Sequence, residues 1–190
     1  MPLTRIVRPD AAHLPDYADA LRRGFEPFTY SGAAAARAHL DAMDRDPAAF
    51  LDSLEDPAGR GPPVLLPDGR AVPRLPGFTR FILGDGFCGV IHFRWQTGST
   101  DLPPHVMGHV GYLVAPWRQR QGHARRALGL LLREVTPLGL PWVELTTDPD
   151  NRASIRVIEA NGGVLAERFT KPPMHGGTEA LRFRVALTRS

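Results

Sequence analysis

The chain has 190 residues, 43% of them apolar, and 23 Lys plus Arg against 20 Asp plus Glu give it a formal charge of +3. This length suits one compact domain of roughly 100–200 residues, and no apolar run approaches the ~18 residues of a membrane helix. A single Cys excludes an intramolecular disulfide and a cysteine-based zinc site, and the proline-broken N-terminal segment lacks the apolar region of a signal peptide. We therefore expect a cytoplasmic single domain over residues 1–190, with no metal and no membrane contact.

The first 60 residues have a helical pattern. Leu14, Tyr17 and Leu21 lie three or four positions apart and predict a helix over 10–23. Ser31 is a candidate cap for an Ala-rich helix, and Pro47 suits the first turn of a helix over 47–55. We expect these helices to form one wall of the molecule, followed by a loop over 57–63.

From residue 64 the pattern changes to strands and turns that alternate with helices. The turn dipeptide Asp85–Gly86 predicts a hairpin over 78–95, after a smaller one over 64–72. The remaining predicted elements are strands over 106–114, 142–147, 163–169 and 180–187 and helices over 122–135 and 151–161.

The positive charge concentrates in residues 118–126, which contain four Arg and no acid. This segment leads into an apolar-striped helix at Gly122, and the N-terminus of a helix offers unpaired N–H groups that attract phosphate. Glycine has no Cβ to hinder the approach of a ligand to the backbone. The segment therefore predicts an anion site, and it has neither the GK[ST] of a P-loop nor a GxGxxG. Trp117 beside it could cover a base or pack on the protein.

Three motifs in order resemble those of one enzyme superfamily. Residues 119–124 (QRQGHA) resemble the Q/R-x-x-G-x-G/A acyl-CoA signature of the GNAT N-acetyltransferases, and they follow a strand that ends in Val114 and Pro116. Asn151 to Gly163 resembles the N-x-x-S/A…E-x-x-G element of that family. Residues 108–114 (GHVGYLV) resemble the GHIGY-type strand of a predicted-acetyltransferase branch. The resemblance spans roughly residues 78–187.

The resemblance implies a fold and a set of cofactor contacts. The fold is α/β (α+β): a mixed, mostly antiparallel twisted sheet, splayed into a V between two central strands and flanked by helices. Residues 64–190 would form the sheet core with the acetyl-CoA site, and residues 1–60 the acceptor-side wall. Acetyl-CoA would be the co-substrate. The backbone of Leu113 and Val114 would pair with pantetheine and the 120–124 backbone with the pyrophosphate, so the implied cofactor residues are Leu113, Val114, Gln119, Arg120, Gln121, Gly122, His123, Ala124, Arg125, Asn151, Ser154 and Val157.

The catalytic residues are less clearly marked. In the GNAT family, which this sequence resembles, a tyrosine on the second helix commonly acts as general acid, but Ile158 occupies that position here. Tyr112 is a substitute candidate, although an aromatic residue in an apolar strand also suits a core. His109 is the first candidate base because histidine titrates near pH 6.5, and Glu144 is the second. Strict strand alternation places His109 on the face opposite Val114, which favours a structural role instead.

These observations predict an N-acetyltransferase that moves the acetyl group of acetyl-CoA to a primary amine of a small molecule or peptide. A CoA-binding module with little catalysis is the alternative, and a nucleic-acid-binding protein using residues 118–126 ranks last. Glu26 and the acids from Asp41 to Asp56 would either attract a cationic amine or form a solvated face. Cys88 is expected to be an inert buried thiol, and a homodimer is common in the resembling family.

Overall fold

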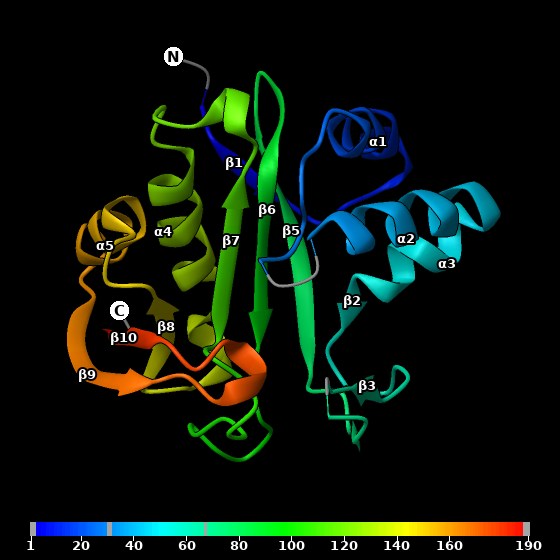
Figure 1. Cartoon of the computed structure of the whole chain (residues 1–190). Coiled ribbons are helices and arrows are strands. Elements are labelled where there is room, and N and C mark those ends of the chain that lie inside the picture. The colour runs from blue at the N-terminus through cyan, green and yellow to red at the C-terminus, as the bar shows by residue number, and fades with distance from the viewer. Residues whose placement is uncertain (1–2, 30–31, 67, 188–190) are drawn as a thin grey trace.

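The computed structural model describes residues 3–29, 32–66 and 68–187, and Figure 1 labels its elements. The strands are β1 (Arg5–Val7), β2 (Glu55–Asp56), β3 (Val64–Leu65), β4 (Ala71–Val72), β5 (Gly77–Gly84), β6 (Gly86–Arg94), β7 (Val110–Val114), β8 (Trp142–Thr147), β9 (Val164–Thr170) and β10 (Glu179–Ala186). The α-helices are α1 (Leu14–Arg22), α2 (Gly32–Arg45), α3 (Pro47–Ser53), α4 (His123–Val135) and α5 (Arg152–Glu159). Short 3-10 turns are η1 (Ala11–His13), η2 (Pro116–Arg118), η3 (Thr136–Leu138) and η4 (Pro173–His175).

The main sheet has the strand order β1-β5-β6-β7, with β2 also paired to β5, and all its ladders are antiparallel. The predicted hairpin over 78–95 is its centre, with Gly86 at φ 81° in the turn, a value that favours glycine. The second sheet, β8-β10-β9, is also antiparallel. Strands β7 and β8 run side by side in the same direction without a ladder between them (Figure 1). The expected fold, with its splay between two central strands, is confirmed.

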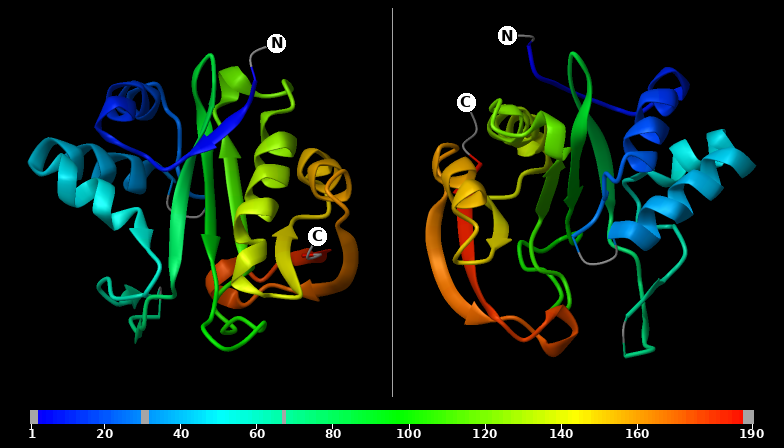
Figure 2. Two further views of the ribbon diagram at one scale, coloured as in Figure 1. Left: turned by 180° about the vertical axis from the view of Figure 1, so that it is seen from behind. Right: turned by 45° about the horizontal axis from the view of Figure 1, so that its top comes forward.

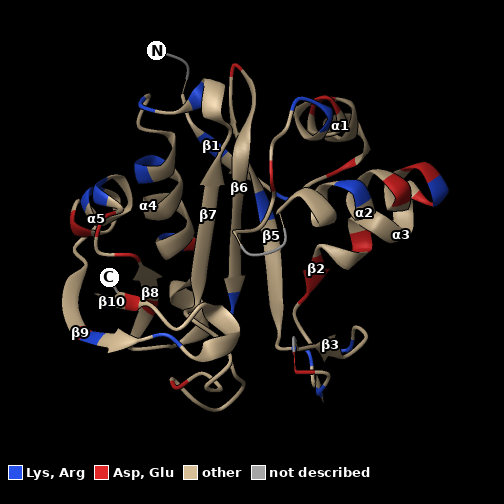
Figure 3. Cartoon of the chain, viewed as in Figure 1, with Lys and Arg blue, Asp and Glu red and all other residues tan. Residues whose placement is uncertain are grey.

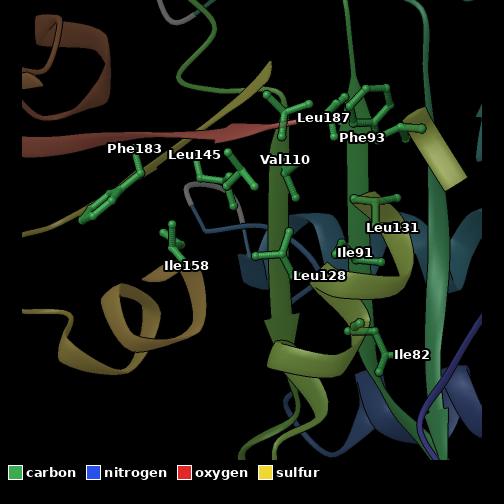
Figure 4. Close-up of a cluster of buried hydrophobic side chains, with 14 of the residues drawn as sticks. Ile82, Ile91, Phe93, Val110, Leu128, Leu131, Leu145, Ile158, Phe183 and Leu187 are labelled. Carbon is green, nitrogen blue, oxygen red and sulfur yellow. The ribbon is translucent and has the colours of Figure 1, made fainter. Parts of the chain in front are cut away.

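Two apolar clusters cover the two faces of the main sheet because successive strand residues point to opposite faces. Ile91 and Phe93 of β6 belong to the cluster under α4 and α5, which extends to β8 and β10 (Figure 4). Val90 belongs to the other cluster, with residues of α1, α2 and α3. Figure 2 shows α4 on one side of the sheet and α1 to α3 on the other.

Two sequence predictions need correction, and one falls outside the described residues. The first 60 residues are not wholly helical: Arg5–Val7 pair with Phe81–Leu83 as an edge strand, a long-range pairing that no local pattern marks. The strand predicted over 106–114 begins only at Val110, because residues 106–109 leave the ladder and turn toward β8. The proposed cap Ser31 lies outside the described residues. No helix in the described ranges is long and apolar enough to cross a membrane.

A buried histidine connects the sheet to the segment that precedes α2. His92 on β6 lies beneath Phe28, and its ring is stacked at 4.7 Å. Its Nε2–H donates to the carbonyl of Pro27 at 3.0 Å, so Nδ1 is free to accept from the Thr79 hydroxyl at 2.9 Å. Burial, and next the charge of Arg94, lower the pKa of His92 to about 4.

We predict that stability declines with acidification between pH 6.5 and 4. A histidine in an unfolded chain has a pKa of about 6.5. Below this pH the unfolded state therefore binds a proton at residue 92, whereas His92 in the folded state stays neutral down to about pH 4. The stabilisation is complete above pH 6.5, and at pH 5 this residue lowers the free energy of unfolding by roughly 1–2 kcal/mol. Urea unfolding at pH 7 and pH 5 measures the loss. His92→Gln should be less stable at pH 7 but less sensitive to pH; equal pH sensitivity in both proteins would contradict the assignment.

Candidate functional site

The loop between η2 and α4 has a backbone shaped to hold an anion. Gly122 precedes α4 with φ 77°, and Arg120 has φ 61°, the one positive φ of a non-glycine residue within the described ranges. Left-handed residues in a loop that leads into a helix turn successive N–H groups toward one point. The first N–H groups of α4 lie at the same place without intrahelical partners. The predicted anion site therefore has the expected backbone form, and we call residues 119–124 the cradle.

Two of the four arginines near the cradle support it from the protein side. Arg126 donates from its guanidinium to the carbonyl of Gln121 and, from Nε, to Thr4 Oγ1 at 2.7 Å. A Cβ on Gly122 would lie 2.8 Å from Arg126 Nη1, so a side chain there requires a displacement. Arg118 donates to the carbonyl of Asp85 in the β5–β6 turn. Arg120 and Arg125 are exposed, and their guanidinium groups have no partner among the described residues, so they remain available to an anion.

His123 points its side chain away from the cradle. The ring is 3% exposed, and Nδ1 lies 3.0 Å from Thr4 Oγ1. Since Thr4 accepts from Arg126, its hydroxyl hydrogen is free to bond His123. Burial, followed by the charges of Arg126 and Arg118, lowers the pKa of His123. Its Nε2 lies 3.6 Å from Cys88 Sγ, a fully buried thiol whose pKa is raised by burial, as expected for an inert cysteine.

Strands β7 and β8 are joined at one end only. The His109 N–H donates to the Glu144 carbonyl at 2.8 Å, and the Glu144 N–H donates back to His109 Nδ1 at 3.0 Å. The Thr146 hydroxyl also donates to the carbonyl of Met107. We call the His109–Glu144 pair of bonds the pin. Beyond it no ladder joins the strands, so the V opens toward Val114 and the cradle.

The pairing of β7 with β6 decides which backbone groups face the V. Arg94 N donates to His109 O, and Ala115 N donates to Cys88 O, both at 2.9 Å. Because such groups alternate along a strand, Leu113 also pairs toward β6, whereas Tyr112 and Val114 direct their polar groups toward β8. Gln119 Nε2 donates to the Val114 carbonyl at 3.3 Å, which connects the cradle to the strand end. Thus Tyr112, rather than Leu113, accompanies Val114 in offering backbone groups to the V.

The α5 helix packs on β8 and α4, beside the V. Asn151 caps it, with Oδ1 accepting from the Ser154 N–H at 3.0 Å, and Val157 packs partly buried against the core. Tyr112 reaches across from β7, and its hydroxyl lies 2.7 Å from Ser154 Oγ. Burial raises the pKa of Tyr112 to about 12, with the Ser154 hydrogen bond acting in the opposite direction. Ile158 is 1% exposed and lies near Leu145 and Phe183 (Figure 4), so it is a core residue.

The two candidate bases are both held in structural contacts. His109 is fully buried beside Phe93, and burial lowers its pKa against the opposing influence of Glu144. Its ring stacks on Phe93, in the same cluster that Val114 packs against. The prediction that His109 lies on the face opposite Val114 is therefore wrong, because residues 106–109 leave the β7 ladder and strand alternation does not extend to them. The Glu144 carboxylate lies 3.0 Å from Arg184 Nε and 3.7 Å from Arg182 Nε.

Charges around the site are mixed. Figure 3 shows acidic and basic segments interspersed along α1, α2 and α5.

Trp117 packs with the α1-side cluster under the guanidinium of Arg23, whose Cζ is 4.1 Å from the ring centroid. Sequence reasoning left this choice open, and it did not find the contacts of Thr4 and Arg126. Within the described ranges no three His, Cys, Asp or Glu residues are grouped so as to hold a metal ion.

Comparison with known proteins gives a family and a fold. A family model described as an acetyltransferase (GNAT) domain matches residues 69–164, about half of the chain. Among solved structures, a RimL ribosomal L7/L12 α-N-protein acetyltransferase in complex with coenzyme A is 15% identical with a TM-score of 0.60, covering 97% of this chain and 94% of that one. The microcin C7 self-immunity acetyltransferase MccE, in complex with acetyl-CoA and AMP, is 11% identical with a TM-score of 0.59, covering 96% and 92%. The ribosomal-protein-S18-alanine N-acetyltransferase from Escherichia coli is 14% identical with a TM-score of 0.55, covering 99% and 96%. No curated protein matches by sequence.

We predict that His109→Leu destabilises the fold. The variant keeps an apolar side chain in the core but leaves the buried Glu144 N–H without its acceptor, which costs about 1–3 kcal/mol. For a chain of this size each kcal/mol lowers Tm by roughly 2–4 °C, measurable by calorimetry. His105→Leu is the matched control, because there the backbone carbonyl, not the ring, accepts a bond from His175. Its stability should change by less than about 0.5 kcal/mol; equal losses in the two variants would show that the pin contributes nothing.

Proposed function

Because the chain belongs to the GNAT acetyltransferase family, we propose that it is an acetyl-CoA-dependent N-acetyltransferase that acts on the primary amine of a small molecule or peptide. The observation that carries the proposal is the cradle at the open end of the V. Its Gly122 and Arg120 both have positive φ, and a Cβ on Gly122 would displace the end of the Arg126 side chain. Two structures of similar fold are described as complexes with CoA or acetyl-CoA, and one of them is described as an α-N-protein acetyltransferase.

The residues present fit acetyl-CoA along the length of the V. The backbone from Arg120 to Ala124 would hold the pyrophosphate, with Arg120 and Arg125 supplying unpaired positive charge. The backbone groups of Tyr112 and the Val114 carbonyl, which face the V, would pair with the pantetheine amides, as an added strand pairs with a sheet edge. Asn151, Ser154 and Val157 would line the other side of that arm. Two further contacts fix the position of the loop. Gln119 is bonded to the Val114 carbonyl at the strand end, and the Gln121 carbonyl is bonded to Arg126.

The reaction needs a neutral amine, a polarised thioester and a protonated leaving thiol. The amine nitrogen attacks the thioester carbon directly, and the bond from that carbon to sulfur breaks as the amide forms. The Val114 N–H, directed into the V, would donate to the thioester oxygen as negative charge develops on it. Tyr112 would protonate the leaving thiolate, since a phenol with a pKa of about 12 keeps its proton at neutral pH.

Glu144 is the proposed acceptor of the proton that the ammonium loses. Its side chain lies on the face of β8 opposite Val143 and Leu145, which are core residues. Its carboxylate pairs with Arg182 and Arg184 on the neighbouring strand β10. His109 acts as a positioning residue in this scheme, because its ring nitrogen holds the Glu144 backbone.

Acetyl-CoA binding is the first test. Wild-type protein should show a rise in Tm with millimolar acetyl-CoA, and Gly122→Glu should abolish it by adding bulk and negative charge to the cradle. Gly98→Glu is the matched control: Gly98 has φ 75° and open space around it, so the backbone strain is similar and the rise in Tm should persist. Circular dichroism establishes that both variants fold. Absence of any rise in the wild-type protein would refute the proposal.

Tyr112→Phe tests the acid. We expect kcat to fall about 10²-fold, the lower end of general acid contributions, while the acetyl-CoA-induced rise in Tm persists. Ser154→Ala removes the hydrogen-bond partner but leaves the phenol, so its kcat should fall less. Thiol release with a panel of amines provides the rates. A Tyr112→Phe enzyme within twofold of wild type would exclude the role, and thiol release from no amine by the wild-type protein would support a CoA-binding module.

A further inference from the structure

The last residue of β6 places an unpaired cation on the acceptor side of the sheet. Val90 packs against the α1-side cluster and His92 lies under Phe28, so strand alternation places the next residue of this series, Arg94, on the same face. Ile91 and Phe93 point to the opposite face, under α4. Arg94 is thus on the side of the sheet that α1 and α2 flank.

The guanidinium of Arg94 is incompletely satisfied. Its Nη1 donates to the Gly108 carbonyl at 3.0 Å, and none of the ion pairs among the described residues includes Arg94. Burial lowers its pKa, without an opposing carboxylate, and its charge in turn lowers the pKa of His92 and His109. A partly buried guanidinium is costly without an anion, and its planar fork suits a carboxylate.

Open space lies beside this guanidinium, over β7. Gly111 pairs with His92, and a Cβ built on it would meet only one group within 4 Å, Arg94 Nη2 at 3.7 Å. Gly111 precedes Leu113 and Val114 by two and three residues, which is about 7–10 Å along a strand. A molecule reacting near Val114 could therefore extend along β7 and reach Arg94 without meeting a side chain at position 111.

We propose that the acceptor is an amine that carries a carboxylate four to six bonds from its nitrogen, and that Arg94 binds this carboxylate. The inference rests on the proposed acetyltransferase function. The carboxylate would accept from the free Nη2 over Gly111 at about 3 Å, on the side of Nη2 nearer Val114, which leaves about 4–7 Å to an amine near Val114. The same chemistry belongs to small ω-amino acids and to peptides whose first residue is Glu.

The experiment compares carboxylates with their amides, which match them in size. The small-molecule pairs are 4-aminobutyrate with 4-aminobutanamide and 6-aminohexanoate with 6-aminohexanamide; the peptide pair is Glu-Ala-Ala with Gln-Ala-Ala, both amidated. We expect the wild-type enzyme to favour the carboxylate at least about tenfold in kcat/KM in one pair or more. The pair that responds distinguishes small acceptors from peptides.

Arg94→Gln keeps a donor for Gly108 and removes the charge. It should abolish the preference for the carboxylate and preserve the acetyl-CoA-induced rise in Tm. Arg94→Lys should retain part of the preference. If no probe is acetylated, titration calorimetry measures the affinity of each carboxylate and its amide for the CoA-bound protein. The same preference for the carboxylate, lost in Arg94→Gln, is then expected in Kd. Equal kcat/KM or affinity for carboxylate and amide in the wild-type protein overturns the inference, and so does a carboxylate preference that persists in Arg94→Gln. Failure of acetyl-CoA to bind the wild-type protein refutes the proposed function itself.

Discussion

The pin between His109 and Glu144 is the constraint on which the site depends. Two strands that met along their whole length would close into one continuous sheet and leave no backbone free. Two strands without any junction would leave the second sheet unattached to the first along this edge. A pair of hydrogen bonds at one end, made by the fully buried His109, joins the sheets and still leaves Tyr112 and Val114 with polar groups facing a gap. A histidine suits this position because its ring nitrogen accepts the N–H that a neighbouring strand would otherwise satisfy.

The second constraint is the network that supports the cradle from behind. Gln121 is bonded by Arg126, Arg126 bonds Thr4, and Thr4 bonds the buried ring of His123. A positively charged loop of four arginines would repel itself. Here Arg118 and Arg126 donate to backbone carbonyls of the protein, whereas Arg120 and Arg125 face solvent. The same residue type therefore serves two purposes within nine positions.

Local features of the site could be predicted from the sequence, and long-range ones could not. The turn at Gly86, the start of α4 after Gly122 and the cap of α5 at Asn151 each depend on one residue and its nearest neighbours. The V and the mostly antiparallel sheet followed from resemblance to a family. The pairing of β1 with β5 and the contact of Thr4 with Arg126 join residues far apart in the chain, and neither leaves a periodic pattern. The orientation of His109 depended on where the ladder of β7 begins, and strand periodicity alone placed that start four residues too early.

The bond between Thr4 and Arg126 joins residues 122 positions apart, at the edge of the sheet. A three-residue edge strand such as β1 is the kind of element that detaches by local opening well before the whole domain unfolds. Each opening of β1 would release Arg126 and free the Gln121 carbonyl to rotate. A molecule held by the cradle would oppose that motion, so its binding energy is linked to the closure of β1. Amide hydrogen exchange of Arg5, Ile6 and Val7 would then report occupancy of a site that these residues do not touch.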